Sequence, residues 1–376
     1  MLERHDTLEC LNQTSSLREK LAKIHVVLNN HLPFIKRIAV AIYDPKTSVL
    51  KTYLHSSSGK EDPLSHYETT IKDAPSLESL MKQGNPRIIK SKVTVERGRH
   101  EHTQRIGREG YAASYTLPMF YNGVFFGFIF FNSSETDVFN ETTLEQLDLY
   151  GHLISLMVIN EINSVQTLVA AISTASHMTH LRDPETGSHL DRMFRYARLI
   201  AKSLAEQYQL DDEYIERVFM FSPLHDIGKL GIPDQILLKP GKLTDEEQTI
   251  MRTHATKGRE MIDNMLANFG FDSIPDVDIL RNIAQFHHEN INGQGYPAGL
   301  AGNSIPLEAR IVAVADVFDA LTSRRPYKEA WSNQEAFAML ERMSGEKLDA
   351  DCVKALIDQQ EEIEQIQEQF KEDLLG

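Results

Sequence analysis

The sequence lacks a cysteine framework. Its only two cysteines, Cys10 and Cys352, lie near opposite ends of the chain, and no Cys-x-x-Cys pair occurs. Neither a disulfide scaffold nor a thiolate zinc site is therefore expected. Such sparse use of cysteine fits a reducing compartment, so we expect a cytoplasmic protein.

Long apolar runs are also missing. The longest, GVFFGFIFF over residues 123–131, is far too short to span a bilayer. The N-terminal residues MLERHDTLECLNQ include no apolar stretch after a basic start. The sequence therefore predicts neither a membrane segment nor an export signal.

Positive charge is scarce. The 376 residues include 39 basic and 54 acidic side chains, which gives a formal net charge of −15. A nucleic-acid polymer is not an expected partner, because such binding depends on neutralising phosphates. A phosphate-containing ligand would have to be held by local positive charge.

Much of the acidity lies at the C-terminus, where residues 346–376 are expected to form an acidic C-terminal helix. The pattern favours a solvated helix packed along one stripe over an interaction tail. The apolar stripe consists of Leu356, Ile363, Ile366, Phe370 and Leu374.

The pattern of strand and helix signals divides the chain into two parts. Residues 36–132 alternate short β-like runs with turns, which predicts an α+β domain with an antiparallel sheet within residues 1–150. In the hairpin turn YNG, Asn122 and Gly123 tolerate positive φ. One helix is expected near SLESLMKQG, and ERGRHEHTQR (96–105) is expected to be a basic loop. The expected strands are KRIAVAIYD, SVLKTYLHS, PRIIKS, YAASYTLPMF and GVFFGFIFF.

A long connecting helix is expected over residues 142–180, where no proline occurs. Its apolar residues alternate spacings of four and three, as in a coiled-coil seam or in a helix packed on a domain. A linker of a homodimer and a simple packed helix are equally compatible with this pattern. The residues concerned are Val158, Ile162, Val165, Val169 and Ile172.

Beyond residue 185 helix signals dominate, which predicts an all-α helical bundle over residues 165–345. Thr244–Glu247 and Ser332–Glu335 match capping boxes. Pro306 suits the first turn of a helix that ends near Ser323.

The bundle contains a series of ligand-type side chains. Successive candidates are 4, 36, 1, 28, 33, 1 and 28 residues apart, so they fall on successive helices, which is how a bundle builds a metal site. Adjacent imidazoles at 287 and 288 do not occur on one apolar helix face by chance, which favours metal binding. The candidates are Glu185, His189, His225, Asp226, His254, His287, His288 and Asp316.

Nitrogen and carboxylate donors without sulfur suit iron, manganese or zinc in an open hydrolytic site. Eight candidates allow two or three ions, and Asp226 can bridge two of them with its two oxygens. Such ions can support in-line displacement at phosphorus. Lys229 could stabilise charge on a phosphate oxygen or protonate a leaving group, and the alternative is a surface lysine at a helix C-terminus.

Four segments carry a family resemblance: HDIGK (225–229), GIPDQILLKPGKL, HHENINGQGYPAGL (287–300) and DVFDALTSRRPYK (316–328). Together they resemble an HD-GYP domain. The resemblance implies a phosphodiesterase that opens cyclic di-GMP to linear pGpG, often with onward hydrolysis to GMP. It also implies a non-haem iron or manganese cluster of two or three ions.

The resemblance also assigns residues. Asp226 would bridge metals, Glu185 would bind the extra ion of members with three metals, and Lys229 would contact phosphate. The family usually has Asp where Asn292 stands, so the loop has one charge fewer here. The loop is also a candidate contact for a diguanylate cyclase partner. The remaining metal ligands would be His189, His225, His254, His287, His288 and Asp316, and the substrate-binding residues would be Lys229, Gly293, Gly295, Tyr296, Pro297, Arg325 and Lys328.

The first half resembles a GAF domain through its strand order, the hairpin YTLPMFYNGVFFGFIFF and the helix LEQLDLYGHLISLMV. This resemblance implies a sensor of an unknown small molecule or a dimerisation module. We therefore expect a multidomain signalling enzyme with a GAF sensor domain (1–150), a connecting helix (142–180), an HD-GYP phosphodiesterase domain (165–345) and the acidic C-terminal helix (346–376). The rivals are a phosphodiesterase for cyclic GMP-AMP, an HD phosphohydrolase for another nucleotide, and a non-catalytic receptor for a cyclic dinucleotide.

Overall fold

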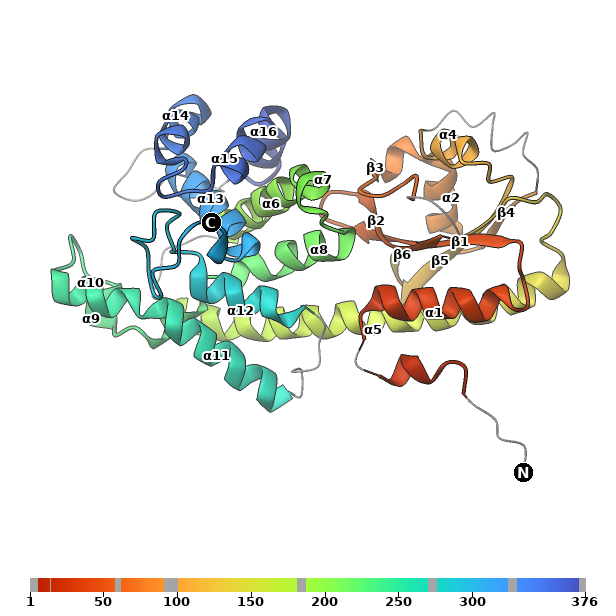
Figure 1. Cartoon of the computed structure of the whole chain (residues 1–376), viewed down its shortest axis with the longest axis horizontal. Helices are drawn as coiled ribbons and strands as arrows, with labels where there is room; N and C mark the ends of the chain where they lie inside the picture. The colour runs from red at the N-terminus through yellow and green to blue at the C-terminus, as the bar shows by residue number, and fades with distance from the viewer. Residues whose placement is uncertain are drawn as a thin grey trace. The chain divides into compact units, whose positions relative to one another are not determined.

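The protein is described by a computed structural model that covers residues 6–13, 15–57, 62–90, 101–180, 187–269, 276–323 and 330–371. The chain divides into two compact units, Met1–Ser164 and Val165–Gly376. The first contains a β-sheet, and the described residues of the second form helices and loops (Figure 1). The expected fold class, an α+β N-terminal part followed by an all-α C-terminal part, is confirmed.

A six-stranded antiparallel sheet with the order β3-β2-β1-β6-β5-β4 forms the centre of the N-terminal unit. Five strands were predicted from the sequence to within about three residues at each end. The sixth, β3, was missed because three residues are too few to show a period of two. The strands are β1 (Ile35–Asp44), β2 (Val49–Ser57), β3 (Glu68–Thr70), β4 (Arg87–Ile89), β5 (Ala113–Tyr121) and β6 (Val124–Ser133).

The turn between β5 and β6 has the predicted hairpin geometry. Asn122 has a φ of 49° and Gly123 a φ of 79°. Positive φ at both central residues matches the right-handed twist of the flanking strands.

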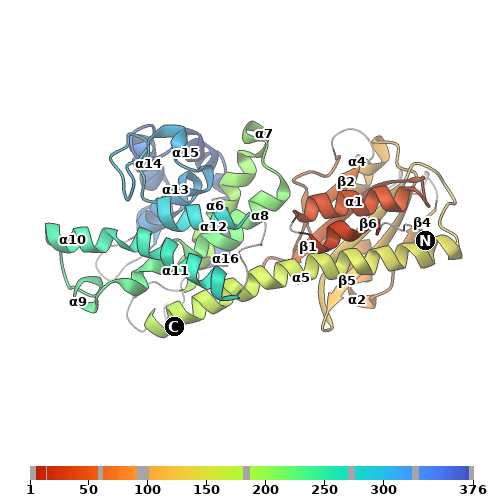
Figure 2. The same ribbon diagram turned by 60° about the horizontal axis from the view of Figure 1, so that its bottom comes forward.

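Helices cover both faces of the sheet (Figures 1 and 2). Helices α1 (Leu17–Asn29) and α5 (Glu141–His180) pack on one face in a common core with the sheet residues Ile38 and Phe131. Helix α2 (Pro75–Gln83) packs on the other face against Phe128.

The second face also carries α4 (Glu101–Arg108), where the sequence predicted a loop. The prediction of a basic loop over residues 96–105 was therefore wrong for its last five residues, while residues 91–100 lie outside the described residues. Ile106, which is buried, is the apolar anchor of this otherwise polar helix. A single anchor is too little to show helical periodicity in a sequence.

The long connecting helix is present as α5, and its apolar stripe is buried within this chain. Val158 and Ile162 belong to the core of the N-terminal unit, and Val165 belongs to the core of the C-terminal unit, with Val169 partly buried against it. Packing on the chain's own cores therefore accounts for the stripe. The side chain of Ile172 lies outside the described ones.

The segment Glu141–Ala170 of α5 is by length and composition apolar enough to cross a membrane, although no such segment was expected from the sequence. Core helices of soluble proteins share this length and composition. Leu147, Ile154 and Val158 are fully buried in the core of the N-terminal unit, whereas Leu149 and Leu156 are exposed.

The C-terminal unit is a helical bundle centred on α6 and α13. Tyr196 of α6 packs edge-on against Phe318 of α13 with 5.1 Å between ring centroids. Both predicted capping boxes are present, and Pro306 is the N-cap of α13. The described helices of this unit after α5 are α6 (Gly187–Ser203), α7 (Ala205–Tyr208), α8 (Asp212–Phe221), α9 (Asp234–Leu237), α10 (Asp245–Arg252), α11 (His254–Phe269), α12 (Val277–Phe286), α13 (Leu307–Thr322), α14 (Asn333–Met343), α15 (Ala350–Ile357) and α16 (Gln360–Gln369), with short 3-10 turns at Ser222–Leu224, Ile227–Gly231 and Gly302–Ser304.

The acidic C-terminal segment forms two helices rather than one. Helix α15 ends at Ile357 and α16 begins at Gln360 after a break at Gln359, whose φ and ψ are −115° and 44°. Leu356 and Ile363 are nevertheless both buried in the core of the C-terminal unit. The expected stripe is thus packed as predicted, and the break reorients its second half, while Leu374 lies outside the described residues.

Replacing Gly127 should destabilise the N-terminal unit. Gly127 has a φ of 155°, and a Cβ atom there would lie 2.0 Å from the carbonyl oxygen of Ala41 on the paired strand. Since a backbone atom cannot move aside cheaply, we expect Gly127→Ala to lower the free energy of unfolding by at least ~2 kcal/mol. Gly123→Ala is the control, because a Cβ there meets nothing within 4 Å and only the positive φ is penalised. Scanning calorimetry of the full chain would contradict this account if both variants lost the same stability.

Candidate metal centre

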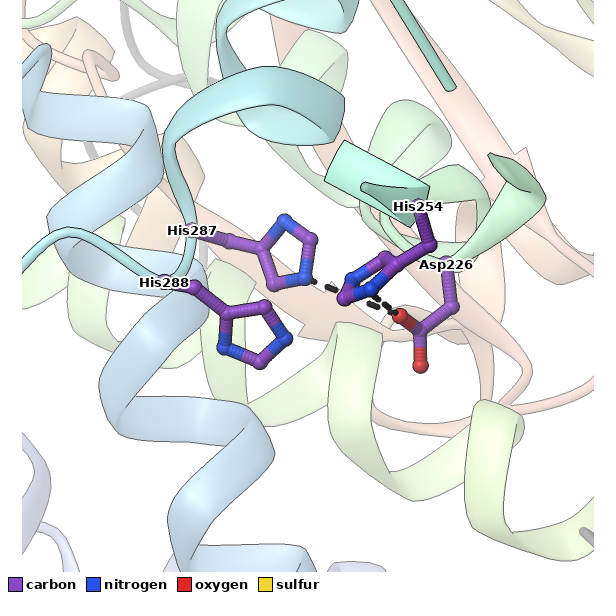
Figure 3. Close-up of side chains that lie close together, drawn as sticks. All are labelled: Asp226, His254, His287 and His288. Atoms are coloured by element: carbon purple, nitrogen blue, oxygen red, sulfur yellow. Dashed lines mark ion pairs between the residues drawn. The ribbon is translucent and has the colours of Figure 1, made fainter. Parts of the chain in front are cut away.

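Asp226 lies at the centre of a cluster of histidines in the C-terminal unit. Its Oδ1 is 3.2 Å from Nε2 of His254 and 3.7 Å from Nε2 of His287, and its Oδ2 is 3.3 Å from Nε2 of His225. His288 completes a group in which the donor atoms of Asp226, His254, His287 and His288 all lie within 4.8 Å of one another. Figure 3 shows the rings of His254 and His287 directed at the carboxylate, with His288 beside His287.

The main chain orients the three histidines around Asp226. The Nδ1 atoms of His225, His254 and His287 each lie 2.8–2.9 Å from a carbonyl oxygen three or four residues earlier. A carbonyl oxygen can only accept, so each Nδ1 carries the hydrogen and donates it. In the neutral ring Nε2 then keeps its lone pair, which is the arrangement found in metal-binding histidines.

The atoms that face the centre of the cluster are buried without hydrogen bonds. Within the part of the chain that the structure describes, Oδ1 of Asp226 and Nε2 of His225, His254 and His287 have no hydrogen-bond partner. Leaving four such polar atoms unsatisfied in one place is costly, and a cation would satisfy all of them. The donor set of imidazole nitrogens and carboxylate oxygens therefore fits a transition-metal ion.

The charges in the cluster also fit a cation. Burial raises the pKa of Asp226, but Lys229 and His225 outweigh this effect and hold that pKa well below its usual range. Burial lowers the pKa of His287, and burial together with His287 lowers the pKa of His288 to about 2. At neutral pH the protein therefore presents a carboxylate and two neutral imidazoles.

His225 behaves differently in the metal-free protein. Burial lowers its pKa, but Asp226 and Asp316 outweigh burial and raise the pKa to about 9. The proton that this ring holds at neutral pH occupies its Nε2, where a metal would bind. Metal binding at His225 would therefore release a proton.

Asp316 and Lys229 lie at the edge of the cluster. Asp316 Oδ1 is 3.9 Å from His225 Nε2, and Lys229 Nζ is 2.7 Å from Asp226 Oδ2. Helix α13, which carries Asp316, is tied to α6 by a buried ion pair of 2.9 Å between Asp319 and Arg192. This ion pair, one turn beyond Asp316, fixes the rotation of α13 toward the cluster.

A backbone contact holds the turn Ile227–Gly231, directly after His225 and Asp226, against the start of α11. A Cβ atom on Gly228 would lie 1.8 Å from the carbonyl oxygen of His254 and 2.4 Å from the amide nitrogen of Gly258. Only glycine fits at residue 228, because both obstacles are main-chain atoms. The contact brings Asp226 and His254 together from separate elements.

The loop at residues 290–300 covers one side of the cluster. A Cβ atom on Gly295 would lie 2.2 Å from the amide nitrogen of Asn290, so the loop folds tightly on itself there. Glu289 is buried, and its carboxylate accepts hydrogen bonds of 2.7–3.1 Å from the amides of residues 298, 299 and 300. This clamp fixes Tyr296, whose ring centroid is 4.8 Å from that of His288.

Arg252 places a second cation near the cluster. Its guanidinium carbon lies 5.3 Å from the centroid of the Tyr296 ring, a cation–π distance. Tyr296 is thus packed between Arg252 and His288, and burial raises the pKa of its hydroxyl. Its hydroxyl, rather than a free ring face, is the group that it can offer to a ligand.

The structure brings together six of the eight metal-ligand candidates: His225, Asp226, His254, His287, His288 and Asp316. Glu185, Arg325 and Lys328 lie outside the described residues, and so does the side chain of His189. Asn292 accepts a hydrogen bond of 3.0 Å from the amide of Gln294, which a carboxylate could equally do.

Sequence reasoning missed three residues of the site. Glu289 follows two histidines and looks like a further ligand, whereas its partners are backbone amides that no sequence pattern reveals. Arg252 and Gly258 matter through contacts with Tyr296 and Gly228, which are distant in sequence. A glycine four residues after a ligand histidine on a predicted helix was the one available signal, since glycine is unfavourable in a helix interior.

Adding Mn²⁺ to metal-free protein should stabilise the C-terminal unit, because the ion would satisfy the buried donor atoms. At a concentration of 100 times Kd the expected gain is about 2.7 kcal/mol. Trp331, the only tryptophan, lies in this unit, so its fluorescence reports the unfolding midpoint. Asp226→Asn should lose most of the gain, whereas Asp358→Asn, at the exposed C-cap of α15, should keep it. An equal gain in Asp226→Asn would mean that Mn²⁺ binds elsewhere.

Solved structures similar to the N-terminal unit include the phycocyanobilin-bound GAF domain from a cyanobacterial phytochrome. The match covers 42% of this chain and 96% of that chain, at 15% sequence identity and a TM-score of 0.33. So low a score supports no inference about a ligand.

Known sequences are similar to the C-terminal half. The cyclic di-GMP phosphodiesterase response regulator RpfG of Xanthomonas campestris pv. campestris is 45% identical over 199 residues, which cover 53% of this chain and 50% of the relative. A cyclic di-GMP phosphodiesterase of Vibrio cholerae is 42% identical over 217 residues, covering 57% and 43%. The 3'3'-cGAMP-specific phosphodiesterase 2 of Vibrio cholerae is 32% identical over 226 residues, covering 59% and 41%.

The chain spans about half the length of the curated relatives that it matches. Residues 179–352 match the family model described as HD domain. This range includes every described residue of the His/Asp cluster. The C-terminal half of the chain therefore contains an HD domain, as its sequence motifs predicted.

Proposed function

We propose that the protein is a metal-dependent phosphodiesterase that hydrolyses cyclic di-GMP to pGpG, with GMP as a further product. The observation that carries this proposal is the convergence of three histidine Nε2 atoms on the Asp226 carboxylate, all buried and without hydrogen-bond partners among the described residues. The similar proteins named as cyclic di-GMP phosphodiesterases support the choice of substrate.

The proposed metal ligands are His225, Asp226, His254, His287, His288 and Asp316, joined by His189 and, for a third ion, Glu185. Iron or manganese suits this donor set. Bound ions would supply positive charge that polarises the phosphodiester and favours attack by water.

The residues of the chain divide the remaining tasks. Lys229, one-fifth exposed beside Asp226, would stabilise charge on a phosphate oxygen. Arg252 and the hydroxyl of Tyr296 would hold the nucleotide at the mouth of the site, together with Gly293, Gly295 and Pro297 of the loop that Glu289 fixes. Arg325 and Lys328 are proposed as further phosphate or guanine contacts. An N-terminal GAF-type sensor domain would regulate this activity.

Cyclic GMP-AMP is the second candidate substrate, because one similar protein is named as specific for it. Both cyclic dinucleotides have the same phosphodiester ring and differ in one base. Rates measured with each substrate on the same preparation would decide between them. A higher kcat/KM for cyclic GMP-AMP would overturn the assignment to cyclic di-GMP.

Asp226→Asn should abolish hydrolysis and deplete metal. Because Asp226 is the shared neighbour of three histidines, its loss should lower kcat by at least ~10³-fold. Protein purified anaerobically should be analysed for iron and manganese per chain, and cyclic di-GMP breakdown should be followed by chromatography in the same sample. Full turnover without bound metal would contradict the proposal, and metal-free binding without turnover would favour a receptor.

Lys229 and Arg252 should affect different kinetic constants. Lys229→Met should lower kcat by about 10²-fold with metal content unchanged, because it removes one donor to the reacting phosphate. Arg252→Met should raise KM by about tenfold with kcat unchanged, because it removes one charged contact to the bound nucleotide. Lys242→Met, at an exposed position after α9, is the matched control and should change neither constant. Metal loss in Lys229→Met would instead indicate that the lysine only supports Asp226.

A further inference from the structure

Helix α16 lies outside residues 179–352, the range that matches the HD domain model, yet it is packed into the C-terminal unit. Ile363 is fully buried in the core of that unit. The side-chain amides of Gln367 and Asn333 exchange hydrogen bonds of 2.8 Å and 2.9 Å, which tie α16 to the first residue of α14. The position of α16 is therefore fixed at two points along its length.

The C-terminal end of α16 contacts α6 through Phe370, the C-cap residue. The main-chain carbonyl oxygen of Phe370 accepts a hydrogen bond of 3.0 Å from Nη1 of Arg192. The Phe370 ring faces the guanidinium of Arg195, one turn further along α6, with 4.3 Å between the guanidinium carbon and the ring centroid. A carbonyl acceptor and a cation–π contact thus hold the end of α16 on α6.

Arg192 also joins α6 to the C-terminal end of α13. Its Nε and Nη2 donate to the two carboxylate oxygens of Asp319, at 2.9 Å and 3.4 Å. Nη2 also donates to the hydroxyl of Ser323 at 2.7 Å, and that hydroxyl donates to Asp319 at 2.6 Å. Because all three side chains are buried, little water competes for these hydrogen bonds.

The place of these contacts along α6 and α13 connects them with the metal centre. Asp319 is one turn beyond Asp316, and Arg192 is one turn beyond residue 189, the position of another proposed ligand. A guanidinium is planar and donates in fixed directions, so its pair with Asp319 defines the rotation of α13 relative to α6. Since the Phe370 carbonyl binds the same guanidinium, the position of this group also depends on α16.

We infer that Arg192 is a positioning residue, through which α16 helps to set the geometry of the metal centre. The inference rests on the proposed function, because it takes Asp316 as a metal ligand. A displaced α16 would move Arg192, and the ion pair with Asp319 would then turn α13. That turn would shift Asp316 from its place 3.9 Å from His225. Residues that orient metal ligands commonly change metal affinity or activity by about 10–100-fold.

Replacing both partners of the Arg192–Asp319 pair tests the inference in a folded protein. Apolar replacement of a whole buried ion pair often leaves stability unchanged, whereas a single replacement leaves a buried charge unpaired. Arg192→Met/Asp319→Leu should therefore unfold at nearly the same temperature as the unaltered protein. In isothermal titration of metal-free protein it should bind Mn²⁺ about tenfold more weakly.

The matched control is Arg198→Met/Glu216→Met, which replaces the ion pair of 2.7 Å between α6 and α8 and should bind Mn²⁺ normally. Unchanged Mn²⁺ affinity in Arg192→Met/Asp319→Leu would overturn the inference. An equal loss of affinity in both double variants would overturn it as well, because the effect would then be one of packing on α6.

A variant at the end of α16 isolates the contribution of that helix. Phe370→Ala removes the ring contact to Arg195 and loosens the last turn, so it should weaken Mn²⁺ binding about threefold. Gln365→Ala, exposed on the same helix, should bind Mn²⁺ normally. Added to Arg192→Met/Asp319→Leu, Phe370→Ala should cause no further loss, since α16 then has no route to α13. Additive losses would show that α16 acts elsewhere and would overturn the inference.

Turnover separates failure of this inference from failure of the proposed function. In metal-saturated protein, Arg192→Lys, which keeps the charge but lacks the planar fork, should lower kcat about tenfold and leave KM for cyclic di-GMP unchanged. A change in KM alone would overturn the positioning role, because it would mean that Arg192 contacts the substrate. Absence of turnover in the unaltered protein would contradict the proposed function, and the Mn²⁺ affinities would still decide the role of Arg192.

Discussion

The metal cluster depends on a contact between two backbone segments of the chain. One is the turn Ile227–Gly231, directly after Asp226, and the other is the start of α11. Gly228 has no Cβ, so the carbonyl oxygen of His254 and the amide of Gly258 can approach it more closely than any side chain would allow. That approach sets the 3.2 Å distance between Asp226 and His254. The rest of the cluster is arranged around this pair, with His287 and His288 from the end of α12 and Asp316 from α13.

The imidazoles of the cluster are oriented by carbonyl groups of their own helical segments. In many metal sites a carboxylate or another side chain has this task. Here the donor of the hydrogen bond and its acceptor are three or four residues apart in the chain, so correct local folding is sufficient to aim each Nε2. Long-range contacts then need only bring the segments together, which the Gly228 contact and the Arg192–Asp319 ion pair do.

Sequence patterns predicted those features that depend on local interactions. Capping boxes, the Asn122–Gly123 turn and five strands were predicted because their signals lie within a few residues of one another. The cluster could be anticipated because ligand-type residues are rare inside apolar helices. Glu289 and Arg252 could not be, because each matters through neighbours that only the folded chain supplies. The basic segment that forms α4 was mistaken for a loop, since tertiary packing of Ile106 overrides a weak local pattern.

The ion pair between Lys229 and Asp226 has a consequence for how a metal ion would enter the cluster. With His225 protonated, the two positive charges offset those of Asp226 and Asp316, so the empty cluster is electrically balanced. These two cations thus occupy part of the place that a bound metal ion would take. Metal binding would then be an exchange, in which the incoming ion displaces the proton of His225 and the ammonium group of Lys229.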